Sequence, residues 1–337
     1  MLVRDGHPFE VVLGRFDDPG ALDRVACSLR AAAAARRLAR ARLGRVGDPA
    51  RGYDCVVLDE QRLSDTIGVR VVPIEPRELA RLYHAVPAPV LAEVVEETRS
   101  LYELDAALQD EDLVRACRGA AALERLVQEH ELDAGALTCH VPGLRFEPGL
   151  GFAPCFALGR MTSKGVPWSC SCDVPAALAL ATLKALGAAA QYHELELVDP
   201  DGDEFLVASS GEHDLAFAGG ERPRLVRNAW FPNDAHPSVC ACFSPPPGPA
   251  TLLGFVQLDR PIPAHRLVVA RGTFGSRRFD RVATPNAAFR FAVEPAADAW
   301  AAWCRGGVAL HAAATPGDLA APVEALGRFL GVEVVRV

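Results

Sequence analysis

Hydrophobic and polar positions change their spacing along the chain, and the change divides it into two parts. In the first part, short apolar runs typical of buried strands alternate with longer stretches of helical periodicity. The expected strands are 9–14, 54–59, 69–74 and 136–141, and the expected helices are 19–43, 75–86, 88–104, 109–130, 153–164 and a buried helix ending at Gly187. This alternation predicts a parallel-sheet α/β domain of Rossmann-like type over residues 1–188.

From residue 190 the pattern becomes one of strands with mixed polarity, separated by turn signals such as "DPDGD". The expected strands are 192–198, 204–210, 251–258, 265–274 and 289–294, followed by a helix at 295–305, a strand at 307–314, a helix at 317–330 and a last strand at 332–337. Such a series is typical of antiparallel sheets. Residues 189–337 are therefore predicted to form a β-barrel-like or sandwich domain with flanking helices.

Composition narrows the class of protein. The chain has 337 residues, half of them hydrophobic, and a formal net charge of −8. This is typical of a globular protein with two domains and argues against general affinity for nucleic acid. The arginines between Arg30 and Arg45 are predicted to lie on a solvated helix face. No run of 18 apolar residues occurs, and Arg4 and Asp5 interrupt a possible signal peptide, so we expect no membrane span and a cytoplasmic location.

The ten cysteines are too few for a disulfide scaffold. Two pairs, Cys170/Cys172 and Cys240/Cys242, have the same C-x-C spacing. This spacing is tighter than that of structural zinc sites, so buried or strand cysteines are the favoured interpretation and a shared zinc site is the alternative.

The segment "VPWSCSCDVPAALALATLKALG" (166–187) combines a polar turn with a buried helix. Asp173 stands just before the helix, where a carboxylate accepts hydrogen bonds from first-turn amides, and Pro175 is tolerated there. A helix cap is therefore the favoured role of Asp173, and a metal-ligating or catalytic role is the alternative.

Four segments resemble the L-fucose/L-arabinose isomerase family, in order and over nearly the whole chain. They are 44–79, 151–180, 192–212 and 306–337. The second is similar to the family's "pC----l---Gip-aCE-D--galtm" segment, and the last to its ending "HH-al--Gd". The resemblance implies a metal-dependent aldose–ketose isomerase that acts on a small sugar and forms a homo-oligomer. Family members usually carry another N-terminal α/β domain, and this chain begins about where that domain would end.

The resemblance assigns metal-ligand positions to Glu194 and His311. This sequence differs from the family pattern at two ligand positions. Ser171 stands where the family has its first acidic ligand, and Ser209 where it has the histidine of its "HCG" motif. Isomerisation needs a base that carries a proton between adjacent carbons and an electrophile that stabilises the enediolate. A divalent ion, Mn²⁺ or alternatively Zn²⁺, suits carboxylate and imidazole ligands. Glu194 is then expected to be catalytic, with Asp173 in place of the missing acid.

Four further residues are candidates for substrate binding: Glu212, His213, Trp168 and His140. Glu212 and His213 lie in a Gly-led turn, whose composition alone could explain them. His140, after Cys139, stands at the end of an expected buried strand, where ligands gather in parallel sheets. Trp168 could stack on a sugar ring, but a large aromatic before a buried helix is more often part of the core. Likewise a lone histidine in "VALHAAA", His311, is usually a hydrogen-bonded core residue.

Two functional hypotheses remain open at this point. The first is a divergent isomerase that acts on a small sugar or derivative, with no nucleic-acid or membrane partner. The second is a catalytically degenerate relative that binds a sugar or serves as a partner subunit. Ser171 and Ser209 favour the second, whereas Glu194 and His311 favour the first.

Overall fold

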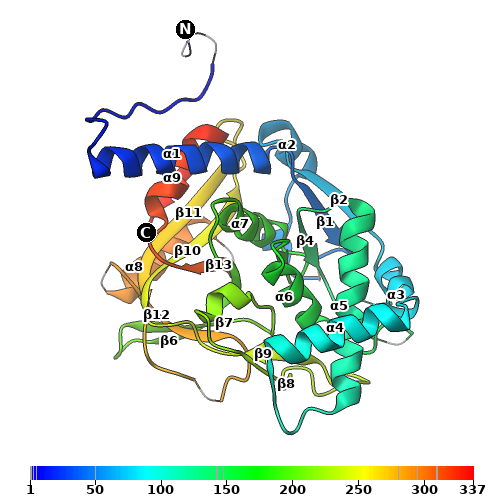
Figure 1. Cartoon of the computed structure of the whole chain (residues 1–337). Coiled ribbons are helices and arrows are strands. Elements are labelled where there is room, and N and C mark those ends of the chain that lie inside the picture. Colours follow the sequence, from blue (N-terminus) through cyan, green and yellow to red (C-terminus); the bar gives the residue numbers. More distant parts are fainter. Residues whose placement is uncertain are drawn as a thin grey trace.

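The computed structural model describes all residues except 1, 3, 5, 50, 142, 147, 280, 294 and 309. It contains a four-stranded parallel sheet and a closed six-stranded antiparallel barrel, with helix α7 (Val174–Ala185) between them (Figure 1). Nearly every side chain of α7 is apolar and most are buried, because the helix packs against the barrel on one side and the parallel sheet on the other. The predicted α/β class and antiparallel barrel are confirmed.

The parallel sheet has the strand order β2-β1-β4-β5. Its strands are β1 (Arg42–Val46), β2 (Arg70–Ile74), β4 (Ala134–Leu137) and β5 (Trp168–Ser169). The accompanying helices are α1 (Pro19–Leu38), α2 (Glu60–Thr66), α3 (Pro76–His84), α4 (Ala88–Leu101), α5 (Asp110–His130) and α6 (Cys155–Ser163). The connections leave β1 and β4 toward opposite edges of the sheet, so a switch point lies between these two strands. In open α/β sheets, ligands bind beyond the carboxyl ends of the strands at such a point.

Three predictions for the first part are wrong. Residues 9–14 form no strand and lie in an irregular segment before α1. Residues 54–59 contain a short 3₁₀ helix, Asp54–Val56, and Val57 is 62% exposed, so this apolar run lies outside the sheet. The helix predicted to reach residue 43 ends at Leu38, and the chain then enters β1.

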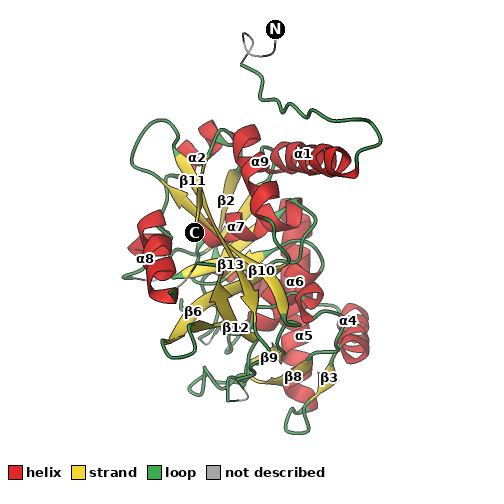
Figure 2. Ribbon diagram, turned by 90° about the vertical axis from the view of Figure 1, so that its left-hand side faces the viewer, coloured by secondary structure: helices red, strands yellow, loops and turns green. Residues whose placement is uncertain are grey.

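The barrel closes because β10 pairs with both β11 and β13. Its strands are β6 (Gln191–Asp199), β7 (Glu204–Ala208), β10 (Gly248–Gln257), β11 (His265–Phe274), β12 (Asn286–Phe291) and β13 (His311–Pro316), and β14 (Glu333–Arg336) adds to β11 in parallel. Helices α8 (Ala296–Gly306) and α9 (Ala320–Leu330) flank it (Figure 2). The strand predicted to begin at residue 307 begins at His311.

A third sheet crosses the expected domain boundary. It has the order β3-β8-β9, with β3 (Glu103–Leu104), β8 (Arg224–Arg227) and β9 (Val239–Cys242). A second short 3₁₀ helix, Leu215–Ala218, precedes β8. One hydrophobic cluster also includes α1, α7 and α9 together with barrel residues such as Leu253 and Val269. The change of architecture falls between α7 and β6, near Gly187, but the core continues across it. No helix in the described part of the chain is both long and apolar enough to cross a membrane.

Candidate functional site

The pairing of β6 with β13 brings Glu194 next to His311. The two residues are directly opposite in this antiparallel ladder, which places their side chains on one face. The Nε2 atom of His311 lies 3.6 Å from Oε1 of Glu194. Residues separated by more than a hundred positions in the sequence therefore meet at one point, and they are the two that the family resemblance assigns to a metal.

Asp173 reaches the same point from the parallel-sheet half. Its Oδ1 accepts a hydrogen bond of 2.6 Å from the backbone amide of Ala176, so Asp173 caps α7 as expected. Its Oδ2 lies 2.7 Å from Nδ1 of His311, and both side chains are almost fully buried. The cap and site roles, weighed above as alternatives, are compatible because each uses a different oxygen.

This arrangement sets the protonation of the imidazole. Burial lowers the pKa of His311, but the hydrogen bond and charge of Asp173 and the charge of Glu194 outweigh it, so the pKa is raised. Burial also raises the pKa of Glu194, although the His311 charge opposes the change. With Asp173 holding Nδ1, the Nε2 atom is the one directed at Glu194 and at any ligand that binds there.

Glu212 provides a second, more deeply buried carboxyl group. It is 1% exposed, and among the described residues neither carboxyl oxygen has a hydrogen-bond partner of good geometry. Burial raises its pKa to about 7; its own backbone amide opposes the shift, and the charge of Glu194 adds to it. The hydroxyl of Tyr192 is likewise buried without a partner. Buried polar groups are nearly always paired, and the neighbouring groups that interact with the Glu212 carboxyl are the buried thiols of Cys155 and Cys170.

We predict that Glu212 makes the folded protein less stable as the pH rises. Its pKa is higher in the folded than in the unfolded chain, so the folded state binds the extra proton between roughly pH 4.5 and 7, and the penalty for a buried charge grows across that window by on the order of 3 kcal/mol. Glu212→Gln should remove this slope. Urea denaturation of both proteins at pH 5 and pH 8 measures it, and parallel pH dependence in the two would contradict the prediction.

The turn between β5 and α7 carries backbone strain. Ser171 and Cys172 have φ values of 56° and 52°, which are uncommon outside glycine. The Oγ of Ser169 donates to the carbonyl of Asp173 at 2.7 Å, and the Cys172 thiol contacts the carbonyl of Val46, so the turn is held at both sides. Strained residues of this kind cluster at functional sites. Ser209 is also engaged, because its Oγ donates to the carbonyl of Glu212.

Two aromatic residues that the sequence did not single out complete the site. The ring of Tyr192 lies 5.0 Å from the His311 ring, and that of Tyr53 lies 6.3 Å away and nearly parallel to it. Tyr192 is two positions before Glu194 on β6, so strand alternation could have identified it. Tyr53 lies in the loop after β1, and no local signal marks it.

The other expected binding residues lie apart from this cluster. His213 is fully buried, its Nε2 lies 2.6 Å from the Tyr102 hydroxyl, and burial lowers its pKa to about 4. Trp168 is also fully buried and packs over Gly135, as in the core alternative. His140 lies at the switch point, lining a hollow of about 510 Å³ at the carboxyl ends of β1, β2 and β4, with Nδ1 3.1 Å from Arg145.

Two side chains, Glu194 and His311, are placed to bind the expected divalent ion. Two ligands about 2.1 Å from a shared ion at a tetrahedral angle lie about 3.4 Å apart, close to the separation of Glu194 and His311. A carboxylate that holds the other imidazole nitrogen, as Asp173 does, is typical of metal-ligating histidines. Within the described ranges, however, no group of three His, Cys, Asp or Glu side chains is arranged to hold a metal ion. The pair therefore fits an ion that takes its remaining ligands from substrate or solvent.

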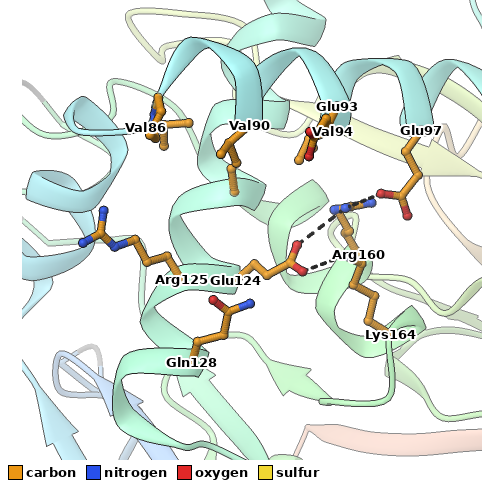
Figure 3. Close-up of a pocket in the computed structure, with 12 residues that line it drawn as sticks. Val86, Val90, Glu93, Val94, Glu97, Glu124, Arg125, Gln128, Arg160 and Lys164 are labelled. Atoms are coloured by element: carbon orange, nitrogen blue, oxygen red, sulfur yellow. Dashed lines mark hydrogen bonds and ion pairs between the residues drawn. The ribbon is translucent and has the colours of Figure 1, made fainter.

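A separate hollow of about 320 Å³ lies between α4, α5 and α6 (Figure 3). Its charged side chains pair with one another: Arg160 lies 2.7 Å from Glu97, and Lys164 lies 2.7 Å from Glu124. None of the expected site residues lines it.

Comparisons with known proteins do not assign this chain to a family. No family model matches the sequence, and no curated protein matches it at a significant level.

Proposed function

We propose that the protein is a cytoplasmic aldose–ketose isomerase of the fucose/arabinose isomerase type, acting on a small sugar or sugar derivative, with a Rossmann-like first domain. The observation that supports it is the meeting of Glu194 and His311, with Nε2 3.6 Å from Oε1, on adjacent barrel strands. A carboxylate–imidazole pair with a second carboxylate behind it matches the needs of proton transfer between adjacent carbons.

Each side chain has a distinct part in this chemistry. Glu194, whose pKa is raised by burial, removes the proton from C2 of the aldose and returns it to C1, while the O2 hydroxyl loses a proton and O1 gains one, so that aldose and ketose are isomers. His311, held by Asp173, donates to the sugar oxygen on which negative charge develops. Glu212, with a pKa of about 7, is the group that can exchange a proton near neutral pH.

In a metal-dependent form of this site, Glu194 and His311 would instead hold a divalent ion, Mn²⁺ or Zn²⁺, with His311 using the Nε2 atom after it has lost its proton. When bound, such an ion supplies Lewis-acid stabilisation of the sugar oxygens. Because two donors meet at that point among the residues that the structure describes, we expect Mn²⁺ to bind weakly to the protein alone and more tightly when a polyol completes its ligands. Titration of Mn²⁺ followed by electron paramagnetic resonance, with and without a polyol, measures this difference, and His311→Asn should abolish it.

The function is tested by incubating the protein and Mn²⁺ with a panel of aldoses and ketoses in D₂O. Isomerisation yields the partner sugar with deuterium at C1 or C2, which NMR detects. His311→Asn should be inactive, and His84→Asn, a change of an exposed histidine, should match the wild type. Absence of both isomerisation and exchange with every sugar would exclude the proposal.

The second candidate is a sugar-binding protein without catalysis. It is favoured by the near-complete burial of His311 and Asp173 and by the serines at 171 and 209. For such a protein we expect sugars to raise the melting temperature and Glu212→Gln to reduce that shift. No deuterium should enter the sugar.

A further inference from the structure

Two cysteines follow the carboxyl ends of neighbouring strands in the parallel sheet. Cys139 comes shortly after β4 and Cys170 directly after β5, and these two strands pair in parallel. The pairing brings together two thiols that are far apart in the sequence, and they form a hydrogen bond with each other. The C-x-C spacing does not mark this pair, because the thiol of Cys172 hydrogen bonds to the carbonyl of Val46 instead. The fold therefore provides two thiols in direct contact, which is the first requirement for a disulfide.

The surroundings of Cys139 favour the thiolate form of its side chain. The hydrogen bond with Cys170 lowers the pKa of Cys139, and burial opposes this change. A hydrogen bond with His140 and the charges of His140 and Arg145 lower the pKa further. Arg145 is held close to this group, with Nη1 3.1 Å from Nδ1 of His140. The thiolate is the nucleophilic form of cysteine, so Cys139 has the environment of a reactive residue.

Other buried thiols of this chain lack such an environment. Burial raises the pKa of Cys117 to about 11 and that of Cys172 to about 12. Cys170 also keeps its proton, because the hydrogen bond with Cys139 and burial both raise its pKa. The pair therefore combines one thiolate with one thiol. This is the combination in which the first sulfur attacks an oxidant and the second resolves the product.

Access to the pair selects a small oxidant. Cys139 is 2% exposed and Cys170 is 8% exposed, so a bulky disulfide such as oxidised glutathione cannot reach either sulfur in line. His140, the neighbour of Cys139, is exposed and lines the hollow of about 510 Å³ at the switch point. Hydrogen peroxide is little larger than water and fits this route.

We propose that Cys139 and Cys170 are a redox-active pair that hydrogen peroxide converts to a disulfide. The Cys139 thiolate attacks one peroxide oxygen, the O–O bond breaks, and hydroxide leaves and takes a proton from solvent. Cys139 is then a sulfenic acid. The Cys170 sulfur attacks the Cys139 sulfur, the S–O bond breaks, and the hydroxyl leaves with the Cys170 proton as water. Two thiols lose two electrons and one peroxide becomes two waters. This inference does not depend on the proposed function.

Mass spectrometry of the reduced full chain after exposure to hydrogen peroxide tests the pair. Remaining thiols are alkylated, and the peptides with Cys139 and Cys170 should be joined with the loss of two hydrogen atoms. Cys117 is the internal control for a buried thiol, since it hydrogen bonds to the hydroxyl of Thr98, and it should stay reduced. Cys55 is the control for an exposed thiol and should be oxidised about tenfold more slowly than Cys139.

Three results on the wild-type chain would overturn the proposal. They are the absence of the Cys139–Cys170 bond, a bond between Cys170 and Cys172 in its place, and oxidation of Cys139 no faster than that of Cys55.

Single substitutions test the order of the two steps. Cys170→Ser should stop the reaction at the sulfenic acid, so that Cys139 gains the mass of one oxygen atom. Cys139→Ser should leave Cys170 unoxidised over the same time, because the attacking thiolate is missing. Oxidation of Cys170 at the wild-type rate in Cys139→Ser would show that Cys139 is not the attacking residue, and the proposal would fail.

Discussion

The variant Glu194→Gln is expected to lose kcat/KM for sugar isomerisation by about 10²–10⁴-fold, the usual contribution of a general acid–base group. Glutamine has nearly the same shape, but its amide cannot accept the proton from carbon. The fold should be unchanged, because Glu194 pairs with Ala208 and His311 through its backbone. Sugar binding, followed by the ligand-induced shift in melting temperature, should be largely retained.

Glu103→Gln is the matched control for this change, since Glu103 is an exposed strand carboxylate far from the site in the sheet arrangement. Its kcat/KM should equal that of wild type. If Glu194→Gln keeps full activity, Glu194 is no base, and the assignment fails even where isomerisation itself is observed.

Asp173→Ala should lower the free energy of unfolding by about 3–5 kcal/mol, because it removes a helix cap worth about 1 kcal/mol and leaves a buried imidazole without its charged partner. Asp173→Asn should cost less, since asparagine is also a good capping residue. Urea denaturation at neutral pH measures both changes.

Asp59→Ala provides the comparison for a cap alone. Asp59 accepts a hydrogen bond from the amide of Arg62 at the start of α2, where it is exposed. This change should cost about 1 kcal/mol. Equal losses for Asp173→Ala and Asp59→Ala would show that the contact with His311 contributes nothing to stability.

Local sequence patterns correctly predicted the elements whose apolar positions also face the core. The helix expected at 109–130 is observed at Asp110–His130, because its apolar stripe faces the core and acidic residues open it. The strand expected at 9–14 shows the limit of the method. Its apolar run is real, but a strand needs a hydrogen-bonded neighbour, and no described strand pairs with these residues. β1 was hidden because "RLARARL" (37–43), the stretch in which α1 ends, contains no Gly or Pro to mark the end of the helix.

The site was less predictable than the fold. Strand alternation shows that Glu194 and Tyr192 share a face, but only the family resemblance connected them with His311. The contact of Asp173 with His311 depends on how α7 lies against the barrel, which no local pattern encodes. Glu212 was noted as a turn residue. Its burial without a partner, which makes it notable, is visible only in three dimensions.

The closed barrel has one further consequence for the pair that it carries. Glu194 and His311 are directly paired on adjacent strands of a closed barrel, so the backbone hydrogen bonds of the closed sheet fix the spacing of their Cα atoms. Asp173, in contrast, arrives from outside the ring on the tip of α7. A longer contact between Asp173 and Nδ1 would lower the pKa of His311, while Glu194 and His311 kept their places on the barrel.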